Sequence, residues 1–222
     1  MPKKGEKKRV AILISGRGSN MVALIKAAKS KSYPATIALV VSNEPSAEGL
    51  KYARKAGIAT AIVDHRAHGK DREAFERALD SELKLHEIDL VCLAGFMRLL
   101  TPWFVGRWSG RMLNIHPALL PAFKGLNAHT RALTADVKIH GATVHFVIPE
   151  MDSGPIIAQA AVAVAQKDTP KTLAARVIKL EHRIFPLALK LVASGHVRIV
   201  DGRCIIKKAA KINSALIVPK PL

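Results

Sequence analysis

An asparagine and a histidine, Asn114 and His116, stand two residues apart at the end of an apolar run that begins at Met112, directly before Pro117. A carboxylate, Asp152, occurs much later, in a turn rich in proline and glycine. An amide can donate a hydrogen bond to a developing oxyanion, and a histidine can deliver or accept a proton. A nearby carboxylate favours the charged form of that histidine. Together the three side chains are suited to acyl transfer through a tetrahedral intermediate.

Other chemistries fit these residues less well. The sequence has no Gly-x-Ser-x-Gly turn, which argues against an α/β hydrolase with a serine nucleophile. A metal site built from His116, His140 and His145 is conceivable, but their spacing matches no zinc signature, so no metal is expected. Taken alone, His116 is better explained as a capping or core histidine.

A second candidate site is the glycine-rich turn at residues 15–20, with the sequence SGRGSN. It follows an apolar run and opens a helical pattern, and a helix N-terminus preceded by glycines favours bound anions. A dinucleotide fingerprint needs a third glycine where Met21 stands, so a nicotinamide cofactor is disfavoured. The turn suits a compact monophosphate, and it is also explained as a helix cap that binds no ligand.

Both candidate sites lie at the ends of predicted strands. Apolar runs alternate with helical patterns. The apolar runs lie at residues 10–15, 37–41, 61–63, 90–94 and 112–115. The helical patterns lie at residues 21–28, 48–56 and 71–86. This alternation predicts a single-domain, Rossmann-like α/β fold, with an open, twisted, mostly parallel sheet and helices on both faces. Residues 140–148 alternate as in an antiparallel strand, residues 156–164 form a further strand, and 169–192 form the longest helix. Because ligands bind at the carboxyl ends of the strands in such sheets, the candidate residues should converge there.

The composition limits the class of protein. With 222 residues, 49% of them hydrophobic, the chain can bury one sizeable core. It has no apolar run long enough for a membrane span. Cys92 and Cys204 form no disulfide framework, which suits the reducing cytoplasm. Half of the net charge of +18 lies in residues 1–9 and 203–222. These basic ends are expected to be solvated rather than to bind nucleic acid, because a nucleic-acid site would interleave aromatic residues with the basic ones.

Several segments occur together in a fixed order: ISGRGSN at 14–20, AGFMRLL at 94–100, LNIHPALLP at 113–121, HGATVHFV at 140–147 and MDSGP at 151–155. In these segments the chain resembles the glycinamide ribonucleotide formyltransferases, a branch of the folate-dependent formyltransferase family, over residues 9 to 195. The resemblance implies transfer of the formyl group of 10-formyltetrahydrofolate, a co-substrate, to the amine of glycinamide ribonucleotide in purine synthesis. It implies no metal and no nicotinamide.

The resemblance also implies roles for individual residues. The expected catalytic residues are Asn114, His116 and Asp152. Glycinamide ribonucleotide is expected to be bound by Gly18, Ser19 and Asn20, at its phosphate, and by Glu181, at its ribose. The expected folate-binding residues are Arg72, Met97, Arg98, Leu99, Leu100, Asn114, Ile148 and Met151. Residues 118–132 correspond to a mobile loop that covers the site.

Three alternatives stay open. Methionyl-tRNA formyltransferases share the Asn-His-Asp set but have a large C-terminal domain, for which there is no room. Formyltetrahydrofolate hydrolases have an N-terminal regulatory domain and tend to have His-His-Ser where this chain has His116-Pro117-Ala118. The third alternative is a basic α/β module that binds nucleic acid and is not an enzyme.

We therefore expect three regions: a basic tail at 1–8, a formyltransferase domain at 9–200 and a basic extension at 201–222. The domain would bind nucleotide with its N-terminal half and folate with its C-terminal half. The expected partners are the two small substrates, with no membrane and no sequence-specific nucleic acid, and the chain is expected to be a monomer or homodimer.

Overall fold

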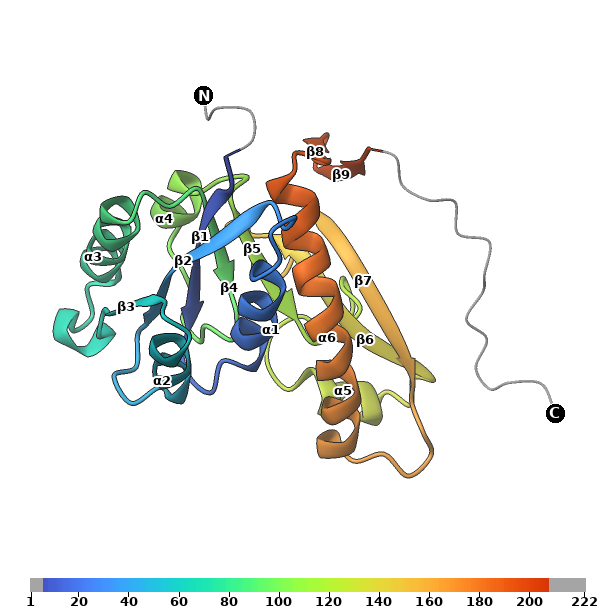
Figure 1. Ribbon diagram of the computed structural model, residues 1–222. Coiled ribbons are helices and arrows are strands. Elements are labelled where there is room, and N and C mark those ends of the chain that lie inside the picture. Colours follow the sequence, from blue (N-terminus) through green and yellow to red (C-terminus); the bar gives the residue numbers. More distant parts are fainter. Residues whose placement is uncertain (1–5, 208–222) are drawn as a thin grey trace.

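The computed structural model describes residues 6–207, which form one seven-stranded sheet with helices on both sides (Figure 1). Across the sheet, the strands are β3 (Ala59–Ile62), β2 (Ala35–Ser42), β1 (Lys8–Ile14), β4 (Leu90–Leu93), β5 (Met112–His116), β6 (Ile139–Phe146) and β7 (Ile156–Ala163). Pairing is parallel from β3 to β5 and antiparallel on both sides of β6, so β6 alone runs against the others. The predicted mostly parallel sheet is confirmed.

The helices cover the two faces of the sheet. They are α1 (Ser19–Ala28), α2 (Glu48–Lys55), α3 (Arg72–Leu85), α4 (Pro102–Arg107), α5 (Ala128–Thr134) and α6 (Pro170–Ala193), with a 3-10 turn, η1 (His65–His68). Buried residues of α1, α2 and α6 pack on one face, and those of α3 and α4 pack on the other. The long helix α6 starts at a capping box, in which Thr169 and Thr172 exchange hydrogen bonds, and has proline at its first position.

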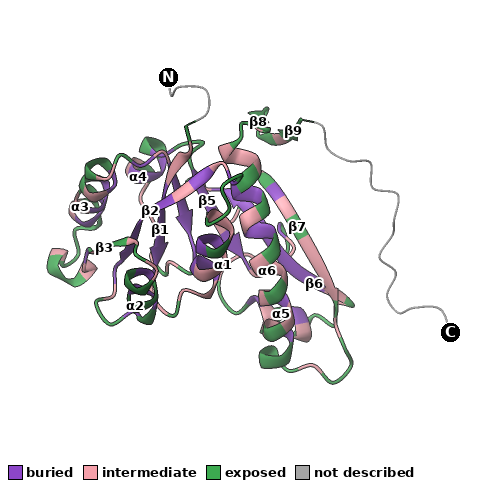
Figure 2. Ribbon diagram, in the orientation of Figure 1, coloured by how far each residue is buried: buried purple, intermediate pink, exposed green. Residues whose placement is uncertain are grey.

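The core follows from this two-sided cover. Alternate residues of β1 point to opposite faces, so Val10 and Ile12 pack with the helices α1 and α6, whereas Ala11 and Leu13 pack with α3 and α4. All four are fully buried, and the central strands are mostly buried (purple) in Figure 2. A strand that is buried on both faces needs apolar residues at every position, which explains the continuous apolar runs of the sequence.

The strand order fixes where a ligand can bind. The chain passes from β1 outward to β2 and β3, and then returns to place β4 on the other side of β1. The loops that follow β1 and β4 therefore leave the sheet in opposite directions and open a crevice between them. These are the loops at residues 15–18 and 94–101, at the lower edge of the sheet in Figure 1.

A short hairpin, β8 (Val197–Val200) and β9 (Arg203–Ile206), was not predicted from the sequence. It turns at Asp201 and Gly202, both with positive φ, and lies at the upper end of α6 in Figure 1. It spans the proposed boundary at residue 200.

Residues 1–5 and 208–222, most of the two proposed tails, lie outside the described residues. Within residues 6–207, no helix has the length and hydrophobicity to cross a membrane.

Candidate active site

Asn114 and His116 lie at the carboxyl end of β5, on alternate positions that share one side of the strand. Strand β6 runs beside them in the antiparallel sense, with His145 opposite Asn114 and Thr143 opposite His116. Asp152 reaches the same place from the turn between β6 and β7. The structure thus brings together all three predicted catalytic side chains from distant parts of the chain.

His116 is 6% exposed, and both of its ring nitrogens face oxygen acceptors. Nδ1 lies 3.3 Å from Oδ2 of Asp152, and Nε2 lies 3.0 Å from the carbonyl oxygen of Phe123. A neutral imidazole has only one N–H, whereas the imidazolium ion has two. The charged form of His116 is therefore the one that satisfies both neighbours.

Asp152 is held in place by its backbone and by its hydrogen bonds. Its φ of 51° is in the left-handed region, and the N–H of Gly125 donates to its Oδ2 at 2.8 Å. Gly154, in the same turn, packs so closely on β6 that a Cβ would lie 1.8 Å from the carbonyl oxygen of Phe146. Burial tends to raise the pKa of Asp152, but the neighbouring His145, the hydrogen bond from Gly125 and the nearby His116 together lower it. Asp152 is thus a carboxylate at neutral pH.

His145 belongs to the same group, although its place in the sequence suggested only a metal ligand. It is 2% exposed, and its Nε2 lies 3.2 Å from Nδ2 of Asn114 and 3.7 Å from Oδ1 of Asp152. Its Nδ1 lies 2.8 Å from the carbonyl oxygen of Phe146, which requires a proton on Nδ1. The neutral ring can then accept the amide hydrogen of Asn114 at Nε2 and so orient that amide.

The glycine turn leads into α1, as predicted. Gly18 adopts φ 72°, and Ser19 and Asn20 form the first turn of the helix. The Asn20 side chain is buried and donates from Nδ2 to Oε2 of Glu181 on α6 at 2.6 Å. Burial raises the pKa of Glu181 more than this bond lowers it. Since the Asn20 amide nitrogen is engaged by Glu181, the backbone N–H groups of this turn are the donors suited to an anion.

The predicted folate-binding residues surround the loop after β4. Arg72, at the start of α3, donates from Nη2 to the carbonyl oxygen of Leu99 at 2.5 Å. The side chains of Met97, Leu99 and Met151 are more than half exposed, which is unusual for large apolar residues. Arg98, Leu100 and Ile148 are of intermediate exposure. An exposed apolar group beside polar backbone is suited to the ring system of a ligand.

The segment 118–132 passes over His116 and is anchored to β6 and β7. The Thr143 hydroxyl donates to the carbonyl oxygen of Ala118 at 2.7 Å and accepts from the N–H of Leu120 at 3.0 Å. Gln159 donates to the carbonyl oxygen of Leu120 at 2.9 Å. The proposed mobility of this loop stays a prediction, and its C-terminal part already forms the start of α5.

His140, the remaining histidine of the candidate metal set, lies in different surroundings. Nε2 of His140 is 3.2 Å from Nδ1 of His129 on α5. Among residues 6–207, no group of three or more histidine, cysteine or acidic side chains is arranged to hold a metal ion.

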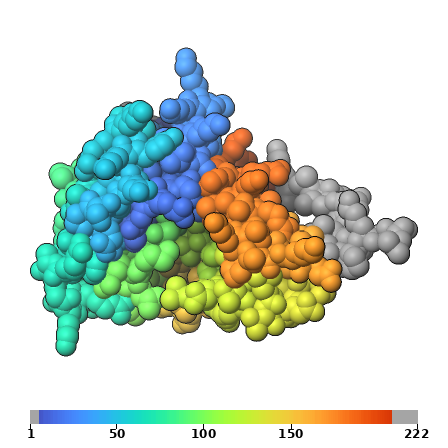
Figure 3. Space-filling view, turned by 90° about the horizontal axis from the view of Figure 1, so that it is seen from below, coloured from blue at the N-terminus to red at the C-terminus, as the bar shows by residue number. Residues whose placement is uncertain are grey.

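Figure 3 shows the face at the carboxyl ends of the strands, where segments far apart in the chain, coloured blue, green, yellow and orange, border a hollow.

Comparison with known proteins agrees with this arrangement. A formyl transferase family model matches residues 8–189. The chain is 45% identical over 193 residues to phosphoribosylglycinamide formyltransferase of Escherichia coli, covering 87% of this chain and 91% of that protein. It is 53% identical to the bovine trifunctional purine biosynthetic protein adenosine-3 over 89% of this chain, and it spans about a fifth (19%) of that relative's length.

The fold agrees as well. The crystal structure of glycinamide ribonucleotide transformylase 1 from Symbiobacterium toebii has a TM-score of 0.89 and 43% identity, covering 92% of this chain and 96% of that one. Sequence, fold and the placement of the Asn-His-Asp set lead to the same conclusion: the chain belongs to the formyl transferase family.

Proposed function

We propose that this protein transfers the formyl group of 10-formyltetrahydrofolate to the amine of glycinamide ribonucleotide. One observation supports this most strongly: Asn114 and His116 stand together at the edge of the sheet, with Asp152 3.3 Å from the histidine ring. They lie at the end of β5, beside β4, whose loop carries most of the proposed folate-binding residues. Family membership supports the reaction class, and the names of the relatives support glycinamide ribonucleotide as the acceptor.

The proposed reaction is a direct transfer. The amine of the nucleotide attacks the formyl carbon, and the formyl oxygen becomes an oxyanion. Asn114 and charged His116 donate hydrogen bonds to that oxyanion. The carbon–nitrogen bond to the folate then breaks, and the proton lost by the amine passes to the departing folate nitrogen. Asp152, 3.3 Å from the ring of His116, stabilises the charged form of the histidine while the oxyanion is present.

The carbonyl oxygen of Phe123 occupies the place that this scheme gives to the formyl oxygen. It lies 3.0 Å from Nε2 of His116, where an oxyanion would have to accept a hydrogen bond. Phe123 belongs to the segment 118–132 and has a φ of 56°. We infer that the substrate displaces this carbonyl when it binds, so the segment must shift during each reaction cycle.

The remaining residues bind the two substrates in this proposal. The backbone N–H groups of Gly18, Ser19 and Asn20 hold the phosphate, and Glu181 accepts hydrogen bonds from the ribose. Arg72, Met97, Arg98, Leu99 and Leu100 line the folate pocket, and Ile148 and Met151 close it from the other side. We also propose that the protein works in the cytoplasm as a monomer or homodimer.

The test is to incubate the protein with 10-formyltetrahydrofolate, with and without glycinamide ribonucleotide, and to follow folate release by absorbance and the nucleotide by mass spectrometry. The proposal predicts a formylated nucleotide and folate release that depends on the acceptor. Rapid release of formate without an acceptor would instead show the hydrolase. Absence of both reactions would contradict a formyltetrahydrofolate-dependent activity.

A further inference from the structure

Residues that follow four adjacent parallel strands are hydrogen-bonded to one another. Ser15 follows β1, Asn43 follows β2, His65 lies in the turn after β3, and Met97 lies in the loop after β4. Because these strands are neighbours in the order β3-β2-β1-β4, the four residues form a row along the carboxyl edge of the sheet. This row runs from the surface at η1 to the crevice between the two substrate loops.

The donors and acceptors give this row a direction. The backbone N–H of Met97 donates to Oγ of Ser15 at 2.7 Å, and the Ser15 hydroxyl donates to Oδ1 of Asn43 at 2.5 Å. Nδ2 of Asn43 lies 3.2 Å from Nδ1 of His65. An amide oxygen can only accept, so the Ser15 proton points to Asn43 and leaves the serine lone pairs for Met97.

Ser15 holds the loop after β4 at two points. Its own backbone N–H donates to the carbonyl oxygen of Gly95 at 3.0 Å, in addition to the bond from Met97. Gly95 has a φ of 77°, so the chain turns sharply between these two contacts. Asn43 is 2% exposed, and a hydrogen bond in such a shielded place is costly to lose. The position of Met97 therefore depends on Ser15 and Asn43.

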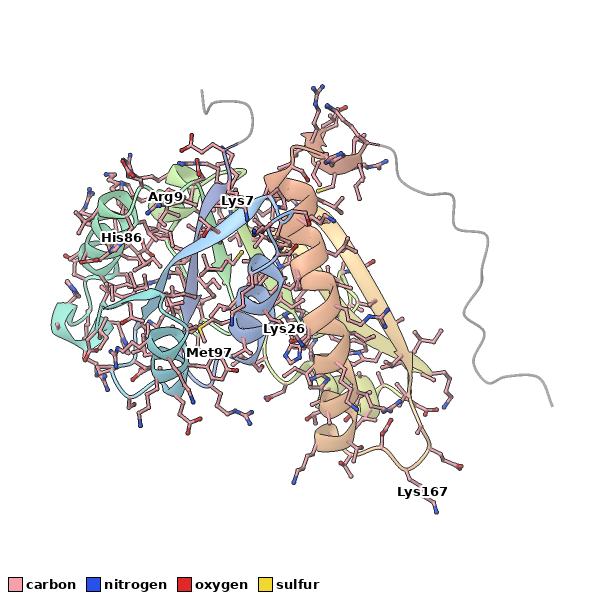
Figure 4. All side chains as sticks on the ribbon, viewed as in Figure 1. Lys7, Arg9, Lys26, His86, Met97 and Lys167 are labelled. Atoms are coloured by element: carbon pink, nitrogen blue, oxygen red, sulfur yellow. The ribbon has the colours of Figure 1, made fainter. Side chains whose placement is uncertain are left out.

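The row connects two different sites of the proposed function. Ser15 directly precedes the glycine turn, and the carbonyl of Gly16 in that turn accepts from the N–H of Gly49 at 3.1 Å. Met97 lies in the proposed folate pocket, at the lower edge of the sheet in Figure 4. A shift of the glycine turn on binding phosphate would move Ser15 and, through it, the loop around Met97.

We propose that Ser15 and Asn43 are positioning residues that couple nucleotide binding to folate binding. This inference rests on the proposed function. When one substrate orders its own loop, the shared hydrogen bonds order the other loop in advance, so the second substrate binds more tightly. By linkage, the effect is the same in both directions.

The test measures the dissociation constant of glycinamide ribonucleotide by calorimetry, with and without saturating tetrahydrofolate, which has no formyl group to transfer. In the wild-type protein we expect tetrahydrofolate to tighten nucleotide binding about 5-fold or more. Ser15→Ala and Asn43→Ala should bring the ratio of the dissociation constants without and with tetrahydrofolate close to 1. Asn43→Asp keeps an oxygen that accepts from Ser15 and should preserve the ratio. Ser81→Ala, which removes a serine bond to Arg77 on α3, is the matched control and should leave it unchanged.

The ratio of the two dissociation constants separates coupling from a general effect on folding. A damaged protein would bind the nucleotide more weakly in both conditions, so both constants would rise and their ratio would stay the same. If Ser15→Ala does not fold, Asn43→Ala provides the same test with the serine intact. The coupling alone would be overturned if the wild-type protein transfers formyl groups but has a ratio of dissociation constants of 1. It would also be overturned if the variants have the same ratio as the wild type. A wild-type protein that neither binds glycinamide ribonucleotide nor transfers formyl would overturn the proposed function as well.

Discussion

The side chains at the candidate centre constrain one another's protonation. His116 faces only acceptors at its two ring nitrogens, whereas His145 donates from Nδ1 and accepts from Asn114 at Nε2. Both histidines lie near one carboxylate, Asp152, but their other neighbours favour the charged form of His116 and the neutral form of His145. We expect charged His116 to act on the substrate and neutral His145 to orient the amide.

Asp152→Asn should slow the reaction and change its dependence on pH. The variant removes the negative charge that faces Nδ1 of His116 at 3.3 Å, so the charged form of the histidine loses its partner. At neutral pH we expect kcat to drop by roughly 10²-fold, the lower end of the range for general acid–base catalysis, because His116 itself is still present.

Asp136→Asn is a matched control, because Asp136 is exposed and paired only with Lys138 in a surface ion pair. The measurement is kcat across pH 5 to 9 at saturating substrates. A wild-type profile in Asp152→Asn would remove the carboxylate from the mechanism.

The elements of the central sheet were predictable because their surroundings leave a clear pattern. Strands covered on both faces require unbroken apolar runs, and the helices that cover them require apolar stripes. The antiparallel register that places His145 opposite Asn114 was not predictable, because it depends on the path of the segment 117–138. The short elements α4, α5 and the hairpin β8–β9 also escaped prediction, because segments of four to seven residues are too short to show a clear periodicity.

The histidine pair between β6 and α5 should make the fold sensitive to acid. Burial, with the neighbouring His129, lowers the pKa of His140 to about 4, compared with 6.5 in an unfolded chain. Between these values the unfolded chain binds more protons, so stability is fully present above pH 6.5 and is lost as the pH falls toward 4. The loss is at most about 3 kcal/mol.

Urea unfolding at pH 7.5 and pH 4.5 measures this effect. His140→Asn should show a smaller loss of stability between the two pH values than the wild type, whereas His196→Asn, at an exposed position, should match the wild type. Equal losses in all three proteins would exclude His140 as the source.

At the scale of the whole molecule, each proposed substrate site draws residues from both halves of the chain. Glu181 of the late helix α6 meets Asn20 of the first helix, and the proposed folate pocket combines the loop after β4 with Ile148 and Met151, which follow β6. The sequence places these residues far apart, and only the resemblance to a family predicted their partnership. The division into three regions at residues 8 and 200 stays a proposal.

The charge of the molecule should assist the capture of its substrates. The net charge is +18, no acidic residue occurs from Gly16 to Asn43, and the exposed side of α6 adds Lys179, Arg183 and Lys190. Both proposed substrates are anions, so a positive field around the site should raise their rate of encounter.

Raising the ionic strength from 0.01 M to 0.15 M shortens the screening length from about 30 Å to about 8 Å. We expect kcat/KM for glycinamide ribonucleotide to fall about 3- to 10-fold, while kcat at saturation changes little. The double variant Lys179→Gln with Arg183→Gln should show a weaker salt dependence than the control Lys51→Gln with Lys55→Gln on α2. A kcat/KM that is independent of salt would contradict electrostatic capture.

The central claim is that Asn114 and His116 act together on one tetrahedral intermediate, and kcat of their alanine variants tests it most directly. Asn114→Ala should lower kcat by roughly 10²- to 10³-fold, and His116→Ala by on the order of 10²- to 10⁴-fold. The double variant should be little worse than the more damaged single variant, because both side chains stabilise the same oxyanion. Near-normal kcat in either folded single variant, or a double variant whose loss is the product of the single losses, would contradict this account.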